Sequence, residues 1–295
     1  ANITQAKIGE IPTGANASGA WIAGFIPHRG PVGETLDLNA GKTALEMLHE
    51  PLASMVLMNF EPEFDAYHPA LSLETLTKVQ EVICITPFVT DRMRSYASIL
   101  LPMALSSETD GTFINMTSDW QSFKAVAKPY GNSKPAWKIL RVLANLFKLP
   151  GFQYNKAKEI TFEIRKNFEQ APVIENQILH KIPEKIEPPL KDRLIRLAPM
   201  AMYRTDSLVR RAQCLQETIE TQSNKKIGLH PETADHLQIQ EGAKVKAQQQ
   251  GRITHEAFEV QLNPNVPKGS ILLYAGFEET LLGAPYSVIT LERVG

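Results

Sequence analysis

The chain has 295 residues, of which 43% are hydrophobic and 21% are charged. This composition supports a sizeable apolar core and excludes a chain that is disordered throughout, and the length favours two domains. Lysine and arginine number 31 against 32 acidic residues, which gives a formal net charge of −1. Because phosphate backbones require a basic surface, this balance argues against nucleic acid as a main partner.

The number of cysteines and the lengths of the apolar runs limit the disulfides and membrane spans that the chain could form. Cys84 and Cys214 are the two cysteines in the sequence, so a disulfide framework is not expected and a reducing compartment is the default. No apolar run approaches the roughly 20 residues that span a bilayer, so we expect no direct membrane insertion. The first residues lack a secretory signal pattern and an initiator methionine, so we expect a piece of a longer chain.

Two early segments carry features of anion binding. Residues 13–31 contain three glycines spaced five apart, followed by His28 and Arg29, which could bind an anion. A structural loop is the favoured reading, since no carboxylate or nucleophile accompanies them. Residues 39–48 contain Gly-Lys-Thr ahead of a predicted helix, but Leu36 stands where a phosphate-binding loop needs its first glycine. A plain helix start is therefore favoured there.

The next segments alternate between strand and helix patterns. Apolar runs of strand length occur at residues 54–60, 81–88 and 98–102. A helix is expected over residues 72–80 with Ser72 as its N-cap, and Thr90 is expected to cap a second helix. Strands joined by helices at this spacing predict parallel pairing with right-handed crossovers.

The stretch Ser106–Phe123, with the sequence SSETDGTFINMTSDWQSF, is rich in polar residues just past a predicted strand. Open α/β proteins bind ligands at such strand ends. Glu108 and Asp110 could act as acid and base, but no histidine, lysine or nucleophile lies near them. The favoured reading is structural, with a turn at Asp110-Gly111, a strand after it and two aromatic side chains packed down. Ligand contact is the alternative.

The clearest predicted helix covers residues 133–151 and has Pro135 in its first turn. We expect its broad apolar face to be core; the face comprises Trp137, Leu140, Val142, Leu143 and Leu146.

The sequence changes character after this helix. A charged amphipathic helix follows over residues 156–168, exposed or at an interface, and leads into a proline-rich linker. Residues 196–220 predict a strand and a helix. The remainder, from residue 225, shows short alternating strands separated by turn signals, which predicts a small β-barrel.

The sequence contains no recognisable pattern of metal-ligating residues. The histidines lack metal-ligand spacing, and His230 and His236 diverge around a short predicted helix. Iron–sulfur ligation needs about four clustered cysteines, which two dispersed residues cannot supply.

Several segments together resemble the molybdopterin-oxidoreductase superfamily. Residues 99–147 carry a strand ending in Leu-Pro, then a glutamate, Asp-Gly-Thr and an asparagine, and finally a Gly-x-x-Lys-Pro-x-Trp-x-Ile segment that opens a helix. The matching positions are Leu101, Pro102, Glu108, Asp110, Gly111, Thr112, Asn115, Gly131, Lys134, Pro135, Trp137 and Ile139. Residues 227–277 are similar to the C-terminal barrel of that superfamily.

Two further segments, residues 14–31 and 203–218, resemble the large peripheral-arm subunit of bacterial NADH-quinone oxidoreductase, respiratory complex I. That resemblance implies a scaffold and interaction region of this subunit, itself non-catalytic, in an enzyme that passes electrons from NADH through flavin and iron–sulfur clusters to quinone. It implies no cofactor in this fragment, iron–sulfur clusters upstream of it, and other peripheral-arm subunits as partners. It also implies a peripheral location on the cytoplasmic side of the bacterial inner membrane.

The resemblance assigns neither catalytic nor metal-binding residues. It leaves a vestigial cofactor groove formed by Glu108, Gly111, Thr112 and Asn115. The alternative is the cofactor-binding half of a true molybdopterin-dependent oxidoreductase of formate or nitrate reductase type, in which these four residues contact the pterin and the barrel contacts its nucleotide tail.

The expected architecture is an α/β fold followed by a small β-barrel. We expect a mostly parallel sheet with flanking helices over residues 1–155, a charged proline-rich linker over residues 156–191, and the C-terminal β-barrel domain over residues 192–295.

Overall fold

The computed structural model describes residues 14–35, 41–50, 52–171 and 193–294. The chain forms two compact units that each combine separate parts of the sequence. The first unit contains Ala1–Glu50, Ile83–Pro87 and Ile99–Lys181, and the second contains Pro51–Val82, Phe88–Ser98 and Ile182–Gly295. The domain boundaries expected after residues 155 and 191 stay a prediction, and most of the predicted linker, from residue 172, lies outside the described residues.

Three short strands form an open sheet in the order β1-β2-β3, with β1 at Ser54–Met58, β2 at Glu81–Thr86 and β3 at Ile99–Pro102. β2 and β3 are parallel, with Ile83 opposite Ile99, as the alternation of strand and helix patterns predicted. Val82, Cys84 and Ile85 are buried, which explains the continuous apolar run of β2.

Side-chain caps fix the starts of the helices near these strands. Thr90 Oγ1 accepts a hydrogen bond from the Met93 amide at 3.0 Å and caps α5 (Asp91–Tyr96), as expected. Thr43 caps α2 (Ala44–His49) in the same manner, together with Glu46. These caps satisfy amides that the first helical turn leaves unpaired.

Helix α4 (Pro69–Leu76) begins earlier than the sequence suggested. Its N-cap is His68, whose Nδ1 accepts a hydrogen bond from the Leu71 amide at 3.2 Å. Pro69 occupies the first helical position, which its fixed φ favours. The expected N-cap, Ser72, lies inside the helix and donates its hydroxyl to the His68 carbonyl at 2.9 Å. The prediction of Ser72 as N-cap was wrong.

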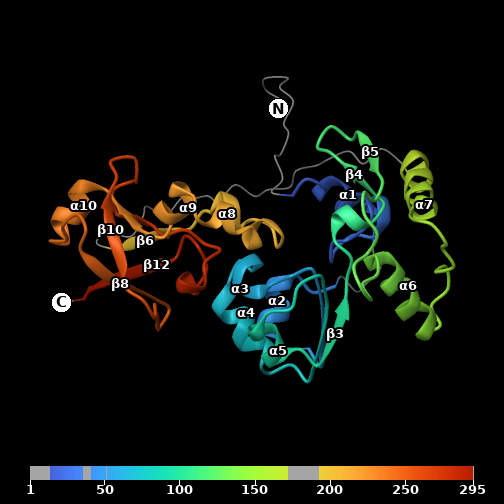
Figure 1. Ribbon diagram of the computed structural model, residues 1–295, viewed down its shortest axis with the longest axis horizontal. Coiled ribbons are helices and arrows are strands. Elements are labelled where there is room, and N and C mark those ends of the chain that lie inside the picture. Colours follow the sequence, from blue (N-terminus) through green and yellow to red (C-terminus); the bar gives the residue numbers. More distant parts are fainter. Residues whose placement is uncertain (1–13, 36–40, 51, 172–192, 295) are drawn as a thin grey trace. The chain divides into compact units, whose positions relative to one another are not determined.

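The first unit contains an antiparallel hairpin of β4 (Gly111–Ile114) and β5 (Trp120–Phe123). It also contains the helices α1 (Ala17–Ile22), α6 (Ala136–Leu146) and α7 (Ala157–Gln170) and the 3-10 helices η1 (Pro31–Gly33) and η2 (Ser106–Glu108). α1 and α7 both contact β4, and Figure 1 shows them beside the hairpin.

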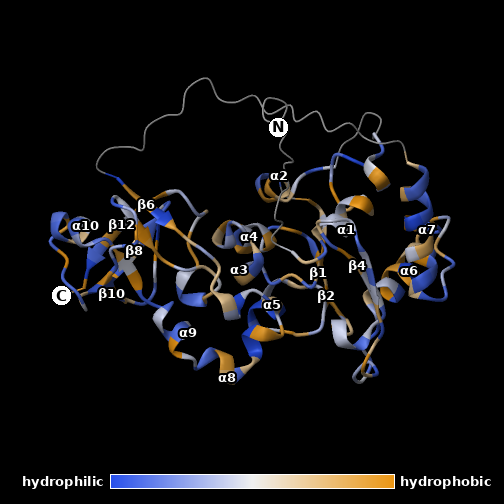
Figure 2. Ribbon diagram, turned by 90° about the horizontal axis from the view of Figure 1, so that it is seen from above, coloured by the Kyte–Doolittle hydropathy of each residue, from blue (hydrophilic) through white to orange (hydrophobic). Residues whose placement is uncertain are grey.

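The apolar face of α6 is not core in the described structure. Ala144 is the one buried residue of this helix, whereas Leu140 and Val142 are exposed and Leu146 is 73% exposed. The prediction of a core helix was therefore wrong, because periodicity identifies an apolar face but does not show what covers it. The expectation for the next helix was correct: α7 has no buried residue, and Figure 2 shows it as mostly hydrophilic.

Six strands of the second unit close into a barrel in the order β10-β7-β11-β6-β12-β8, with β10 pairing back to β8 and β9 attached to β8. The pairing is mixed, since β10–β7 and β11–β6 are parallel and the other barrel pairs are antiparallel. The expected barrel is confirmed. The mostly parallel sheet expected over residues 1–155 holds only in part, because β2–β3 is parallel whereas β4–β5 is antiparallel. The strand bounds are Leu194–Leu197 (β6), Ile227–Leu229 (β7), Lys244–Gln249 (β8), Arg252–Ile253 (β9), Phe258–Leu262 (β10), Ser270–Leu272 (β11) and Val288–Arg293 (β12).

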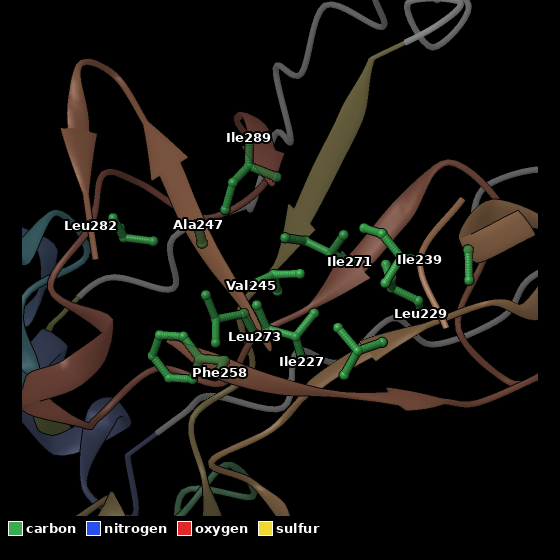
Figure 3. Close-up of a cluster of buried hydrophobic side chains, with 12 residues drawn as sticks. Ile227, Leu229, Ile239, Val245, Ala247, Phe258, Ile271, Leu273, Leu282 and Ile289 are labelled. Atoms are coloured by element: carbon green, nitrogen blue, oxygen red, sulfur yellow. The ribbon is translucent and has the colours of Figure 1, made fainter. Parts of the chain in front are cut away.

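Alternating residues of these strands fill the barrel interior. Ile227, Val245, Phe258 and Ile271 are buried and point toward one another in Figure 3. Burying a side chain of this kind contributes roughly 1.5–3 kcal/mol, so this cluster accounts for much of the stability of the second unit.

Short helices connect the remaining segments of the second unit. They are α3 (Pro62–Asp65), η3 (Met202–Arg204), η4 (Val209–Arg211), α8 (Gln213–Gln216), α9 (Ile219–Ser223), α10 (Pro231–His236) and η5 (Glu278–Thr280). Within the described ranges, every helix is too short or too polar to cross a bilayer.

Gly111 gives a test of the hairpin. A Cβ at this position would overlap the Phe123 ring, with Cε1 only 2.9 Å away. We expect Gly111→Ala to lower the free energy of unfolding by about 1–3 kcal/mol, measured by urea denaturation. Gly14, where a Cβ would meet no atom within 4 Å, is the control, and Gly14→Ala should change stability by less than about 0.5 kcal/mol. Equal effects at both positions would contradict the close contact.

Candidate functional site

Three of the four residues of the expected groove serve the local fold. Glu108 Oε2 accepts a hydrogen bond from the Leu105 amide at 3.1 Å within η2. Asn115 Oδ1 accepts from the amides of Thr117 and Asp119 at 3.0 and 2.9 Å, which closes the turn between β4 and β5. Gly111 lets Phe123 approach the backbone. These contacts match the structural interpretation of the stretch. They do not bear on whether the four residues contact a cofactor.

The fourth residue, Thr112, lines a cavity of about 230 Å³, named here the hydroxyl cavity. Its walls come from α1, the hairpin, α6 and α7, and they comprise Asn16, Gly19, Ala23, Asp110, Thr112, Ile114, Trp120, Trp137, Ala157, Ile160, Thr161 and Ile164. Thr112 Oγ1 lies 3.1 Å from Thr161 Oγ1 and 3.0 Å from Ser122 Oγ. The hydroxyl bond between Thr112 and Thr161 joins β4 to α7.

The charge of the hydroxyl cavity does not suit an anion. Asp110 contributes a carboxylate, and among the described residues no lysine, arginine or histidine lines the cavity. The volume also lies below the roughly 300–1,000 Å³ that is usual for drug-sized ligands. A phosphate-bearing cofactor needs positive or N–H donor groups, so its phosphate does not fit here.

A second polar site lies in the second unit, where the chain leaves β1. Glu61 is 2% exposed, and its two carboxylate oxygens face Arg210 Nε at 3.2 Å and Arg211 at 2.9 Å. Arg210 also forms paired bonds to both oxygens of Asp65 at 2.9 and 3.0 Å. These four residues, Glu61, Asp65, Arg210 and Arg211, are named the acid–arginine cluster. Charges buried this deeply require such partners.

Aromatic rings complete the surroundings of this cluster. The guanidinium carbons of Arg204 and Arg210 lie 5.1 and 4.8 Å from the centre of the Phe64 ring. Arg211 lies 4.3 Å from the Phe88 ring, and Arg204 also lies 5.1 Å from Phe277. Arginine over an aromatic face is favourable, more so where water is excluded.

Glu63 and Arg92 lie outside the cluster and also retain unfilled hydrogen-bonding capacity, as Glu61 Oε2 and Arg210 Nε do within it. Among the described residues, buried Glu63 Oε2 and Arg92 Nε have no hydrogen-bond partner. Burial raises the pKa of Glu63, and the nearby Glu61 raises it further. Arg92 reaches Glu278 only loosely, at 3.7 Å. Both residues follow a strand of the open sheet, Glu63 after β1 and Arg92 after β2.

A lysine-lined cavity of about 200 Å³ lies nearby in the same unit and is named the lysine cavity. Lys225 lies 3.6 Å from Glu279 and Lys244 lies 3.7 Å from Glu259, whereas Lys226 forms a closer pair with Glu259 at 2.6 Å. Phe277 connects the two regions, because it lines this cavity and also packs against Arg204.

Glu63 and Arg92, which follow strands of the open sheet, were not predicted from the sequence as part of a site. The available signal was the sequence Glu-Pro-Glu-Phe-Asp directly after an apolar strand, since carboxylates at a strand end are a recognised ligand position. The partner arginines follow about 145 residues later, and spacing alone cannot pair them. Within the described residues, no group of three His, Cys, Asp or Glu side chains is placed to hold a metal ion.

Comparison with known proteins finds a family model and relatives to which parts of this chain are similar. Residues 5–146 match the family model described as molybdopterin oxidoreductase. The F420-dependent formate dehydrogenase subunit alpha of Methanocaldococcus jannaschii is 27% identical over 293 residues, which covers 83% of this chain and 42% of that protein. A protein of Staphylococcus aureus (strain MRSA252), provisionally named a formate dehydrogenase, is 39% identical over 72 residues, or 24% of this chain and 7% of its own.

The fold is also similar to a solved structure, acetylene hydratase from Pelobacter acetylenicus. The TM-score is 0.59 at 13% sequence identity, over 91% of this chain and 48% of the other. At this identity the likeness concerns the fold alone. The chain spans less than half the length of each of these three proteins.

The matches correct the expectation of a fragment without cofactor. The match of residues 5–146 to the molybdopterin oxidoreductase model, together with the similarity to a formate dehydrogenase subunit, implies that molybdopterin binds in this region. The sequence argument failed because it treated an incomplete set of catalytic residues as evidence against a cofactor. A bound cofactor can supply the reactive group itself, so the protein needs only residues that hold and orient it.

The acid–arginine cluster gives a stability prediction. Arg210→Met removes the partner of two carboxylates and leaves Glu61 buried with one partly exposed arginine, so we expect a loss of about 3–5 kcal/mol. Arg165→Met is the control, because the Arg165–Glu169 pair is exposed on α7 and should contribute less than about 1 kcal/mol. Chemical denaturation of both variants measures the difference. Similar losses in both would show that the cluster is not a buried determinant of stability.

Glu63 predicts a dependence of stability on pH. Its pKa is raised in the folded state above the ordinary value of 4.5, so the folded protein binds the proton more tightly than the unfolded chain. The stabilisation that comes from protonated Glu63 is complete below pH 4.5 and is lost as the pH rises through the folded-state pKa. We therefore expect Glu63→Gln to be more stable than the parent at neutral pH, with the difference shrinking toward pH 4.

The control for this experiment is Glu220→Gln, on the exposed side of α9. Thermal unfolding is followed at several pH values between 4 and 8 for both variants. A Glu63→Gln difference that stays constant across this range would contradict the assignment.

Proposed function

Because residues 5–146 match the molybdopterin oxidoreductase family model, we propose that this chain is the cofactor-binding part of a molybdopterin-dependent oxidoreductase of the formate dehydrogenase type. The match to the M. jannaschii formate dehydrogenase subunit over 83% of the chain is the observation that carries the proposal. This match supports the alternative drawn from the sequence, a molybdopterin-dependent oxidoreductase, more than a scaffold region of a complex I subunit.

The second unit contains the residues whose chemistry fits the cofactor. The unfilled carboxylate oxygen of Glu63 can accept from an N–H edge of a pterin, and Arg92 Nε can donate to a ring oxygen or nitrogen. Lys225 and Lys244 are each loosely paired with a glutamate, and each can exchange that carboxylate for the phosphate of the cofactor. The second unit therefore supplies acceptors, donors and positive charge, whereas the hydroxyl cavity offers no cation.

When bound, the cofactor supplies a redox-active metal centre. In formate oxidation, formate loses two electrons and one proton to become carbon dioxide. The proposed part of Glu63, Arg92 and the lysines is to bind and orient the cofactor. The acid–arginine cluster keeps the segment after β1 in place, so that Glu63 stays fixed while a ligand binds.

A subunit of respiratory complex I is the narrower candidate. The segments 14–31 and 203–218 favour it by their resemblance to the large subunit of the peripheral arm. The formate dehydrogenase relatives favour the enzyme instead. Peripheral-arm subunits as partners and a site on the cytoplasmic side of the inner membrane depend on this candidate and stay predictions.

Cofactor content tests the proposal. The protein is expressed in a bacterial host that makes molybdopterin and in a matched strain that does not, and released pterin is oxidised and measured by fluorescence. We expect pterin in near-stoichiometric amount from the first host only. A protein that folds correctly and carries no pterin from either host would overturn the proposal.

The lysines give a variant for the same assay. Lys225→Gln with Lys244→Gln should lower the pterin content at least about tenfold, because each charge-assisted bond to phosphate contributes roughly 1.5–3 kcal/mol. Lys268→Gln is the matched control, since Lys268 pairs with Glu232 away from the lysine cavity. An equal loss in the control would indicate a general effect of charge rather than a phosphate contact.

A further inference from the structure

The hydroxyl cavity of the first unit is a separate place where a ligand could bind. Its lining is drawn from α1, β4, β5, α6 and α7, and two tryptophan rings, Trp120 and Trp137, contribute to it. Ile114, Ile160 and Ile164 add further apolar surface. Walls that are mostly apolar with a few convergent polar groups are typical of small-molecule sites.

The polar groups of this cavity include both donors and acceptors. Asp110 Oδ1 accepts from the Ala125 amide at 2.9 Å, while no described residue pairs with Oδ2. Asn16 Oδ1 accepts from the Ile114 amide at 2.8 Å, while no described residue pairs with its Nδ2 hydrogens. Thr112 and Thr161 share one hydroxyl bond; Thr112 also bonds to Ser122 and Thr161 donates to the Ala157 carbonyl, so each hydroxyl retains capacity to accept a further hydrogen bond. A hydroxyl group matches such a mixed wall, because it both donates and accepts.

The surrounding charges restrict the ligand to an uncharged compound. The carboxylate of Asp110 opposes an anion. Cations already lie near the rings: Arg165 is 5.9 Å from Trp120, and Lys138 and Arg141 are 5.4 and 6.0 Å from Trp137. These side chains oppose a second cation at the same rings. The small volume of about 230 Å³ further limits the ligand to about one ring.

We propose that the hydroxyl cavity binds a small uncharged ring compound that carries several hydroxyl groups. The apolar face of such a ring packs on the indole and isoleucine side chains, while its hydroxyls bond to Asp110, Asn16 and the two threonines. This chemistry has two sources, a free monosaccharide or the ribose of a nucleoside. The inference does not depend on the cofactor contacts proposed above, because Glu63, Arg92, Lys225 and Lys244 lie in the other unit.

The three tryptophans allow a direct test. The 295-residue chain labelled with nitrogen-15 gives one indole signal for each of Trp21, Trp120 and Trp137, and single tryptophan-to-phenylalanine variants assign them. We expect titration with glucose or uridine to shift the signals of Trp120 and Trp137 and to leave that of Trp21 unchanged. Trp21 serves as the internal control, because it does not line the cavity.

The choice of probe distinguishes the two sources. Tighter binding of glucose indicates a monosaccharide site, and tighter binding of uridine indicates a nucleoside site. Glucose 6-phosphate should bind at least about tenfold more weakly than glucose, because its phosphate meets the carboxylate of Asp110. The proposal is wrong if neither uncharged probe shifts the two signals at millimolar concentration, or if Trp21 shifts equally.

Two variants separate binding from folding. Ala157→Leu fills the cavity and should abolish the shifts. Thr161→Val removes one hydroxyl at nearly constant volume and should weaken binding about tenfold. Thr290→Val is the matched control on exposed β12 of the second unit and should bind as the parent does. Unchanged affinity in the folded Thr161→Val variant would overturn the proposed contacts, even if Ala157→Leu failed to fold.

Discussion

The buried ion pairs of Glu61 with Arg210 and Arg211 are the constraint on which the second unit depends. They connect the segment that follows β1 to a segment about 145 residues further along the chain. Neither partner could be buried without the other, because an isolated charge in a dry interior has no compensation for lost hydration. The two segments are therefore expected to fold together, and the unit is discontinuous in sequence for this reason.

Local features of the fold were predictable because they depend on a few neighbouring residues. Thr90 caps its helix with its own hydroxyl, and the apolar run of β2 reflects burial on both faces. Long-range features were not predictable from one sequence. The exposed face of α6 has the same periodicity as a buried face, so Leu146 looks like core until its neighbours are known. His68 as a cap was missed because histidine rarely has this role.

The candidate sites also divide into local features that the sequence revealed and long-range features that it did not. The stretch around Gly111 was prominent in the sequence because its polar residues lie close together along the chain. In the structure, Glu108 and Asn115 use that polarity to close their own turns. Glu63 was inconspicuous, yet it is a buried carboxyl with an unfilled oxygen. Its environment arises from residues distant in sequence, so only the tertiary structure reveals a raised pKa there.

The two cavities differ in charge in a way that limits what each can bind. Three lysines and three glutamates line the cavity of the second unit, whereas Asp110 is the charged residue of the described lining of the hydroxyl cavity. The lysines can pair with a phosphate in place of their glutamates, whereas the lining of the hydroxyl cavity offers a carboxylate and no cation. One anionic ligand would therefore not satisfy both sites. The chain combines the charge pattern expected for a phosphate-bearing cofactor with a separate cavity whose chemistry favours an uncharged compound.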